Sequence, residues 1–147
     1  MYSHERHLQL NGLQDLRRVR ERHSISALQR VRDLLAELRI KLDDTERAIE
    51  SLERERITLF DSRRGITHRG GLFTLRRHAS QLDTRRIGLA LTRAQLELDI
   101  ATAIEDESRA RATAVSATRQ RDKLEHVSQL WQCESRIRMQ RYEDDAA

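Results

Sequence analysis

Apolar residues recur at alternating spacings of three and four along residues 28–59. This spacing places about one residue per turn on a common helix face. The ten positions are Leu28, Val31, Leu35, Leu38, Leu42, Thr45, Ile49, Leu52, Arg56 and Leu59. All of them except Thr45 and Arg56 are aliphatic. The pattern predicts a helix whose coiled-coil seam extends over more than four heptads.

Toward the N-terminus the same spacing meets polar residues. It passes through Ser24 and Glu21, whereas Leu8, Leu16 and Val19 follow a different phase. We therefore expect a phase shift, fraying or a bend around Gly12 and residues 20–24.

A second heptad register begins near Leu72, although it is less purely apolar than the first. Its positions are Leu72, Leu75, Ala79, Leu82, Arg86, Leu89, Arg93, Leu96, Ile100, Ala103, Glu107, Ala110, Ala114, Ala117, Arg121, Leu124, Ser128 and Trp131. A second stripe is expected beside it, formed by Ile87, Leu91, Ala94, Leu98 and Ala101. Alanine predominates in the seam over residues 101–117, which predicts a thin and less stable half of the hairpin, or a segment that flexes or twists.

The two registers are separated by a glycine-rich segment. Gly65, Gly70 and Gly71 are three of the five glycines in the chain, and there is no proline in its 147 residues. The sequence predicts an all-α single domain over residues 1–147, a long two-helix antiparallel coiled-coil hairpin. Its arms cover about residues 3–60 and 72–142, with a turn at about 61–71. Pairing between two chains, with the turn opened into one continuous helix, remains an alternative.

The predicted arms differ in length. At about 1.5 Å per residue, the second arm exceeds the first by roughly 18 Å, so the C-terminal helix should overhang. Trp131, Cys133, Ile137, Met139 and Tyr142 fall on that overhang. At the opposite end, Phe60, Ile66 and Phe73 lie among arginines. They form a docking surface, or the two phenylalanines cap the hairpin against each other.

Charge argues against a polyanion-binding protein. Lysine and arginine number 28 against 24 acids, a net charge of +4, and only Lys41 and Lys123 are lysines. Most of the positive charge is interleaved with acids, which is typical of ion pairs on helix surfaces. We expect no nucleic acid partner. Neither a signal peptide nor a membrane-spanning segment is expected, because no apolar run is long enough.

The sequence offers no chemistry typical of an active site. Cys133 is alone, and no glycine-rich phosphate loop precedes a helix. His4 and His7 could share a helix face, but they lie near a terminus where solvent exposure is expected. Paired carboxylates such as Asp43 and Asp44 stand on open surface. We expect no enzymatic activity, no cofactor and no metal site.

Residues 71–98, GLFTLRRHASQLDTRRIGLALTRAQLEL, resemble the central stalk proteins of bacterial type III secretion ATPases. These include the InvI and YscO proteins of injectisomes and the flagellar protein FliJ. The late segment WQCESRIRMQRYEDD is similar to the injectisome members. The resemblance implies a hairpin whose terminal ends enter the pore of a hexameric secretion ATPase. It also implies that the turn end faces the cytoplasmic domain of the export gate, and that secretion chaperones bind in some systems.

The resemblance implies site residues at the turn end, and geometry alone indicates those at the terminal end. The export-gate contact is expected at Leu72, Phe73, Leu75, Arg76, Ala79 and Leu82. The ATPase-ring contact is expected at Leu8, Leu16, Trp131, Arg136, Arg138 and Tyr142. The implied location is the bacterial cytoplasm, peripheral to the inner membrane through the secretion apparatus. A coiled-coil adaptor or chaperone escort that leaves any ATPase unaffected is the alternative, because it needs the same seam.

Overall fold

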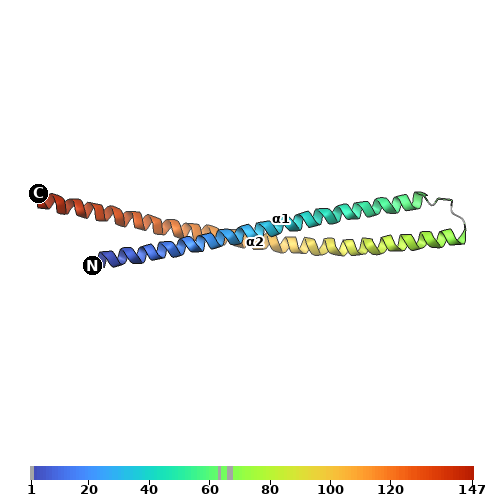
Figure 1. Cartoon of the computed structure of the whole chain (residues 1–147), viewed down its shortest axis with the longest axis horizontal. Coiled ribbons are helices and arrows are strands. Elements are labelled where there is room, and N and C mark those ends of the chain that lie inside the picture. Colours follow the sequence, from blue (N-terminus) through green and yellow to red (C-terminus); the bar gives the residue numbers. More distant parts are fainter. Residues whose placement is uncertain (1, 63, 66–67) are drawn as a thin grey trace. The chain divides into compact units, whose positions relative to one another are not determined.

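The chain forms two long helices, α1 (Tyr2–Ser62) and α2 (Arg69–Ala146), in a computed structural model (Figure 1). The structure describes residues 2–62, 64–65 and 68–147. Within this part there is no strand, and the two helices pack against each other antiparallel. The prediction of an all-α two-helix hairpin is therefore confirmed.

The connection between the helices is shorter than the predicted turn of about residues 61–71. The N–H of Leu72 donates to the carbonyl of His68 over 3.2 Å, so the first turn of α2 already contains Gly70 and Gly71. Gly65 lies in the connection with a φ of 86°, a backbone conformation that residues other than glycine rarely adopt. Ile66, expected at this end, lies outside the described residues.

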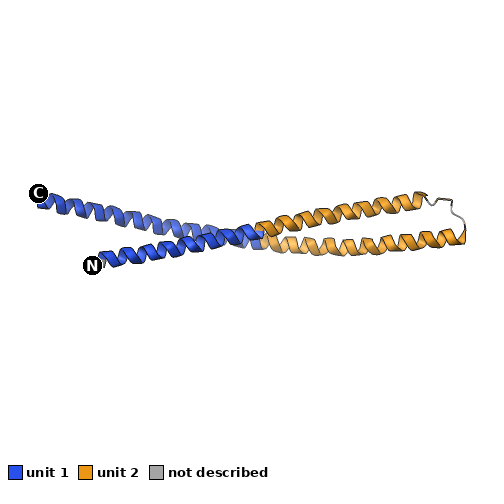
Figure 2. Cartoon of the chain, viewed as in Figure 1, with its two compact units in different colours: residues 1–31, 106–147 blue, residues 32–105 orange. Residues whose placement is uncertain are grey.

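The hairpin divides into two compact units, and each contains a stretch of both helices (Figure 2). Unit 1 consists of residues 1–31 and 106–147, and unit 2 of residues 32–105. Unit 2 therefore contains the end near the connection, and unit 1 contains both termini.

Unit 2 is held together by an apolar seam. Leu35, Leu38 and Ala103 are buried together, and Leu96 and Ile100 pack against them. All the predicted seam positions of α1 in this unit are buried or half-buried. Two ion pairs flank the seam, with Arg86 Nε 3.3 Å from Glu53 and Arg56 Nη1 3.8 Å from Asp83. The predicted register of residues 28–59 is confirmed.

In unit 1 the expected phase shift is absent. α1 runs unbroken through Gly12, and the half-buried or buried positions keep the heptad spacing. These positions are His7, Leu10, Gln14, Arg17, Glu21, Ser24 and Leu28. The expectation was wrong because polar side chains occupy the interhelical seam here. Glu21 and Arg17 each form a hydrogen bond with a residue of α2, so their register faces α2 although it is not apolar.

The second stripe of α2 also departs from expectation. Ile87, Leu91 and Leu98 are exposed, whereas Leu89, Leu96 and Ile100 face α1. At 100° per residue the two sets lie on opposite faces of the helix rather than side by side. α2 is therefore apolar on two faces over this stretch.

Candidate functional site

The two termini lie together in unit 1, where the ATPase-ring contact was predicted (Figures 1 and 2). Trp131 is half-buried, and its ring forms a T-shaped contact with the ring of His7 at a centroid distance of 6.2 Å and an interplanar angle of 85°. Trp131 therefore pairs with α1 and does not stand on a free overhang, which corrects that expectation. The aromatic contact extends the interhelical seam into the first turns of α1.

A shorter overhang remains beyond this contact. Since His7 faces Trp131 in an antiparallel pair, Tyr2 falls at the level of Arg136, and α2 continues to Ala146. Ten residues at 1.5 Å each extend about 15 Å past the start of α1. Ile137, Met139 and Tyr142 are exposed on this segment.

The other predicted ring-contact residues are accessible. Leu8 and Leu16 are exposed, and with Val19 they lie on the face of α1 directed away from α2. Arg136 and Arg138 are exposed on α2, with Arg138 3.8 Å from Glu134. Apolar and arginine side chains thus share the outer surface of unit 1, a composition that is enriched at protein interfaces.

Between these leucines and the alanine seam lies a charged cluster that the sequence analysis did not identify. Arg121 donates from Nη1 to Oε1 of Glu21 over 3.0 Å, and its Nε lies 2.9 Å from the other carboxylate oxygen. Arg17 bonds the amide of Gln120 in the same seam, and Arg18 lies 3.8 Å from Glu125. The signal was present, since Glu21 and Arg121 both fall on their helix's heptad register.

The electrostatics of this cluster favour a permanently charged arginine. A hydrogen bond to Asp122, together with the nearby carboxylates of Glu21 and Glu125, raises the pKa of Arg121 although partial desolvation opposes this. Glu21 is the less exposed partner, with 13% of its side chain accessible. Glu21 and Arg121 therefore join α1 to α2 by an ion pair in unit 1, whereas leucine side chains join the two helices in unit 2.

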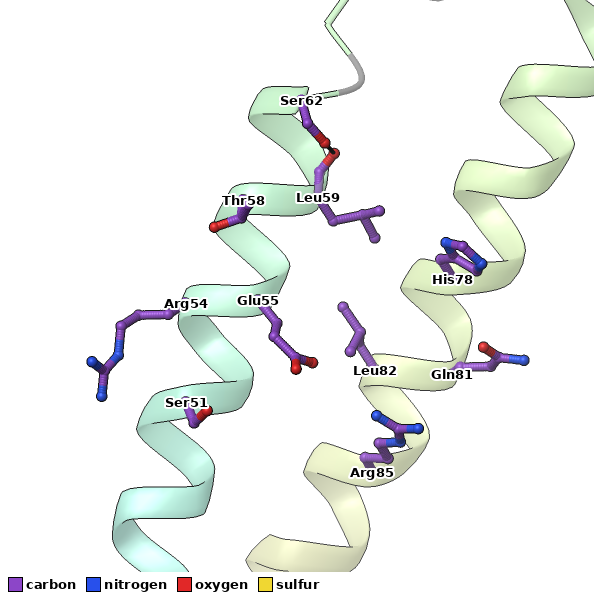
Figure 3. Close-up of a pocket in the computed structure, with 10 residues that line it drawn as sticks. All are labelled: Ser51, Arg54, Glu55, Thr58, Leu59, Ser62, His78, Gln81, Leu82 and Arg85. Atoms are coloured by element: carbon purple, nitrogen blue, oxygen red, sulfur yellow. Dashed lines mark hydrogen bonds between the residues drawn. The ribbon is translucent and has the colours of Figure 1, made fainter.

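Near the connection, unit 2 has a groove between the helices with an apolar floor (Figure 3). Leu59 and Leu82 point toward each other across it, whereas Arg54 points away from it. His78, Gln81 and Arg85 line the side formed by α2. The groove is open and amphipathic, which suits contact with a protein better than enclosure of a small molecule.

The six predicted export-gate residues do not form one accessible surface. Leu75, Ala79 and Leu82 are half-buried and face α1, because they belong to the seam. Leu72, Phe73 and Arg76 are exposed, and Phe73 lies on the opposite face from the seam. Phe60 lies under the guanidinium of Arg56 at 6.0 Å, and no ring contact in the described residues joins it to Phe73.

The described residues contain no group of three or more histidine, cysteine or acidic side chains placed to hold a metal ion. Nor does either helix, over its described length, carry a stretch apolar enough to cross a membrane. Cys133 is exposed and has a free thiol.

No protein-family model matches the sequence, and no curated protein matches it. Among solved structures, the type III secretion protein YscO from Vibrio parahaemolyticus is similar, with a TM-score of 0.79. The match covers 98% of this chain and 93% of that protein, and the sequences are 18% identical. This chain therefore has the fold of a type III secretion protein, YscO, over nearly its whole length.

Proposed function

We propose that this chain is the central stalk of a bacterial type III secretion export ATPase of the injectisome class. The observation that carries the proposal is the fold shared with YscO across 98% of the chain. The chain has no catalytic role of its own. It inserts its terminal unit into the pore of the hexameric ATPase and couples ATP hydrolysis to the export gate.

The surface of unit 1 supports insertion into a ring. Leu8 and Leu16 offer apolar contacts on α1, and Arg136 and Arg138 offer positive charge on α2. Exposed arginines make weak and screened contacts with carboxylates, which break and reform quickly. Such contacts suit a ring whose subunits change conformation in turn better than one tight lock does.

The end of unit 2 near the connection is proposed to face the cytoplasmic domain of the export gate. Leu72, Phe73 and Arg76 are the exposed members of the predicted set and make this contact in the proposal. The protein then works in the bacterial cytoplasm, peripheral to the inner membrane. Secretion chaperones are further partners in this proposal.

The test is the turnover of a type III secretion export ATPase from the same organism, measured with and without the full chain. We expect stimulation of turnover and a more stable hexamer. The double variant Arg136→Glu/Arg138→Glu should lose most of the stimulation. Its matched control is Arg39→Glu/Lys41→Glu, two charge reversals at exposed positions in unit 2, which should retain it.

Cys133 provides a second readout that does not depend on turnover. Its thiol is exposed and is the only one in the chain, so a maleimide reports on this position alone. Adding the ATPase hexamer should slow labelling at least about tenfold if this part of α2 enters the pore. Unchanged labelling together with unchanged turnover would refute the stalk and favour the adaptor.

A further inference from the structure

In unit 2, α2 carries an apolar surface that the hairpin itself does not use. Ile87, Leu91 and Leu98 are 62%, 67% and 64% exposed, and Ala94 lies between them on the same face. We call these four residues the outer ridge. Leu89, Leu96 and Ile100 of the same stretch pack toward α1, on the opposite face.

The spacing of the outer ridge is that of a second helix-packing seam. Its members follow one another at four, three and four residues, as the inner seam does. A single exposed leucine needs no explanation, but a set in register along one face does. A helix that is apolar on two opposite faces is typical of one packed between two neighbours, of which α1 is one.

The charge around the ridge indicates what the second neighbour carries. Residues 69–86, which precede the ridge, include five arginines and one acid, Asp83, so this part of α2 has a charge of +4. Within the ridge Arg93 lies 3.9 Å from Glu97, so that stretch is neutral. Asp83 is 3.8 Å from Arg56, and Glu53 is 3.3 Å from Arg86. Arg76 and Arg77 have no carboxylate within ion-pair distance in the described part of the chain. Arg77 stands two heptads before Leu91, in the same row of the ridge.

We propose that the outer ridge binds an acidic amphipathic helix of a partner protein. The apolar face of that helix packs along residues 87–98, and its carboxylates lie beside Arg76 and Arg77. This surface is distinct from the groove of Figure 3, because ridge and groove lie on different sides of α2. The arginines fix the direction of the bound helix, since they flank only the end of the ridge nearer the connection.

A second copy of the chain fits the ridge less well. Only three large aliphatic side chains are available, too few to hold two chains together without a charge contribution. A second copy laid parallel along the ridge places Arg76 and Arg77 against their own counterparts, which opposes association. An acidic helix adds attraction at the same positions.

The test uses the full chain and a synthetic 21-residue helical peptide as the probe. The peptide has leucine at its a and d positions and glutamate at the flanking positions. One control peptide replaces the glutamates with lysine, and the other replaces the leucines with serine. Fluorescence anisotropy should show at least about tenfold weaker binding for both controls, because the proposal needs the apolar face and the negative charge together.

Variants of the chain then locate the site. Leu91→Ala/Leu98→Ala should weaken binding of the acidic peptide at least tenfold. The matched control is Ile40→Ala/Ile57→Ala, which removes two aliphatic side chains from α1 that are 62% and 60% exposed, and it should leave binding unchanged. Arg76→Glu/Arg77→Glu should reverse the preference toward the lysine peptide. All these side chains are exposed, and circular dichroism checks that the variants remain folded.

Equal weakening by the ridge variant and its control would overturn the proposal, as would equal binding of the acidic and lysine peptides. Sedimentation equilibrium tests the competing occupant. A dimer that is lost in Leu91→Ala/Leu98→Ala, with no binding of the acidic peptide, assigns the ridge to a second copy and refutes the acidic helix. None of these outcomes depends on ATPase turnover, so failure here leaves the stalk proposal standing.

Discussion

Unit 1 and unit 2 share one heptad spacing but fill it differently, because the seam of unit 1 mixes polar with apolar residues. In unit 2 the seam is filled by leucine and isoleucine around Leu38 and Ala103. In unit 1 the same positions of α1 include Gln14, Arg17 and Glu21 beside the buried Leu10, and the seam of α2 contains Ala114 and Arg121. Heptad spacing therefore sets the path of the helices in both units, whereas the residues at those positions set how strongly each unit holds together.

Both units also carry exposed apolar side chains on their outer surfaces. Unit 1 directs Leu8, Leu16 and Val19 away from its own partner helix. These side chains contribute less to the stability of the hairpin than the buried leucines do, because 44–58% of their surface stays exposed to water. Unit 1 thus combines a partly polar seam with exposed apolar side chains, a combination that suits a segment stabilised by a partner.

The largest effect should come from Leu38→Ala in unit 2. Leu38 is buried against Leu35 and Ala103, and a truncation of this kind costs about 2–5 kcal/mol because it leaves a cavity. The free energy of unfolding is measured by urea denaturation followed by circular dichroism. Leu16→Ala is the control in unit 1 and should change stability by less than about 1 kcal/mol, as exposed positions do. Equal losses would mean that unit 1 buries Leu16.

Enlarging alanine should also distinguish the units. Ala103 is the most buried core residue, so Ala103→Leu should cost about 1–3 kcal/mol through overpacking. Ala117 lines an open groove between Arg17 and Gln120, and Ala117→Leu should be neutral or stabilising, since a leucine has room there. Thermal denaturation of the two variants gives the comparison. A comparable loss for both would show that the seam of unit 1 is as tightly packed as that of unit 2.

The charged pair is the next test, and its effect should be intermediate. Glu21→Ala leaves Arg121 half-buried without its main partner across the seam. The loss should be several times that of Asp43→Ala, which removes a 2.9 Å surface pair with Arg47 that contributes about 0.2–0.5 kcal/mol. Replacing both partners, as Glu21→Leu/Arg121→Leu, should raise the melting temperature, because an apolar pair completes the seam.

These two outcomes have different meanings. If Glu21→Ala lowers stability no more than Asp43→Ala does, the Glu21–Arg121 pair stabilises the fold no more than a surface ion pair. If the double leucine variant is less stable than the native chain, unit 1 needs the charge for its register, as single polar seam residues do in coiled coils. Both variants should also be less sensitive to salt than the native chain, since the screened contact is gone.

The sequence was sufficient to predict the fold and the register of residues 28–59. Leucine and isoleucine at three- and four-residue spacings leave one face that can be buried, and the structure uses it. The same reasoning failed for Leu8, Leu16 and Val19, because it assumed that apolar residues define the seam. There the ion pair of Glu21 with Arg121 keeps the polar register in the interhelical seam. The two residues lie 100 positions apart in the sequence.

The predicted sites fared unequally for a related reason. A sequence match selects neighbouring residues, whereas a helix places neighbours 100° apart. Leu75 and Phe73 were therefore grouped in one predicted surface although they face opposite sides of α2. The outer ridge was detected as a stripe, but only the packing of Leu96 and Ile100 against α1 establishes that this stripe faces outward.

The smallest predicted effect tests whether backbone propensity explains any of the difference between the units. Gly12 in unit 1 and Gly88 in unit 2 both lie within helices, and a Cβ added at either would meet no atom within 4 Å. Gly12→Ala and Gly88→Ala should each raise stability by about 0.5–1 kcal/mol, because alanine restricts the unfolded chain and favours the helix. Similar gains in urea denaturation would leave seam chemistry as the cause of the difference. A gain confined to Gly12→Ala would instead mean that this glycine weakens unit 1, and that the polar seam matters less than the comparison implies.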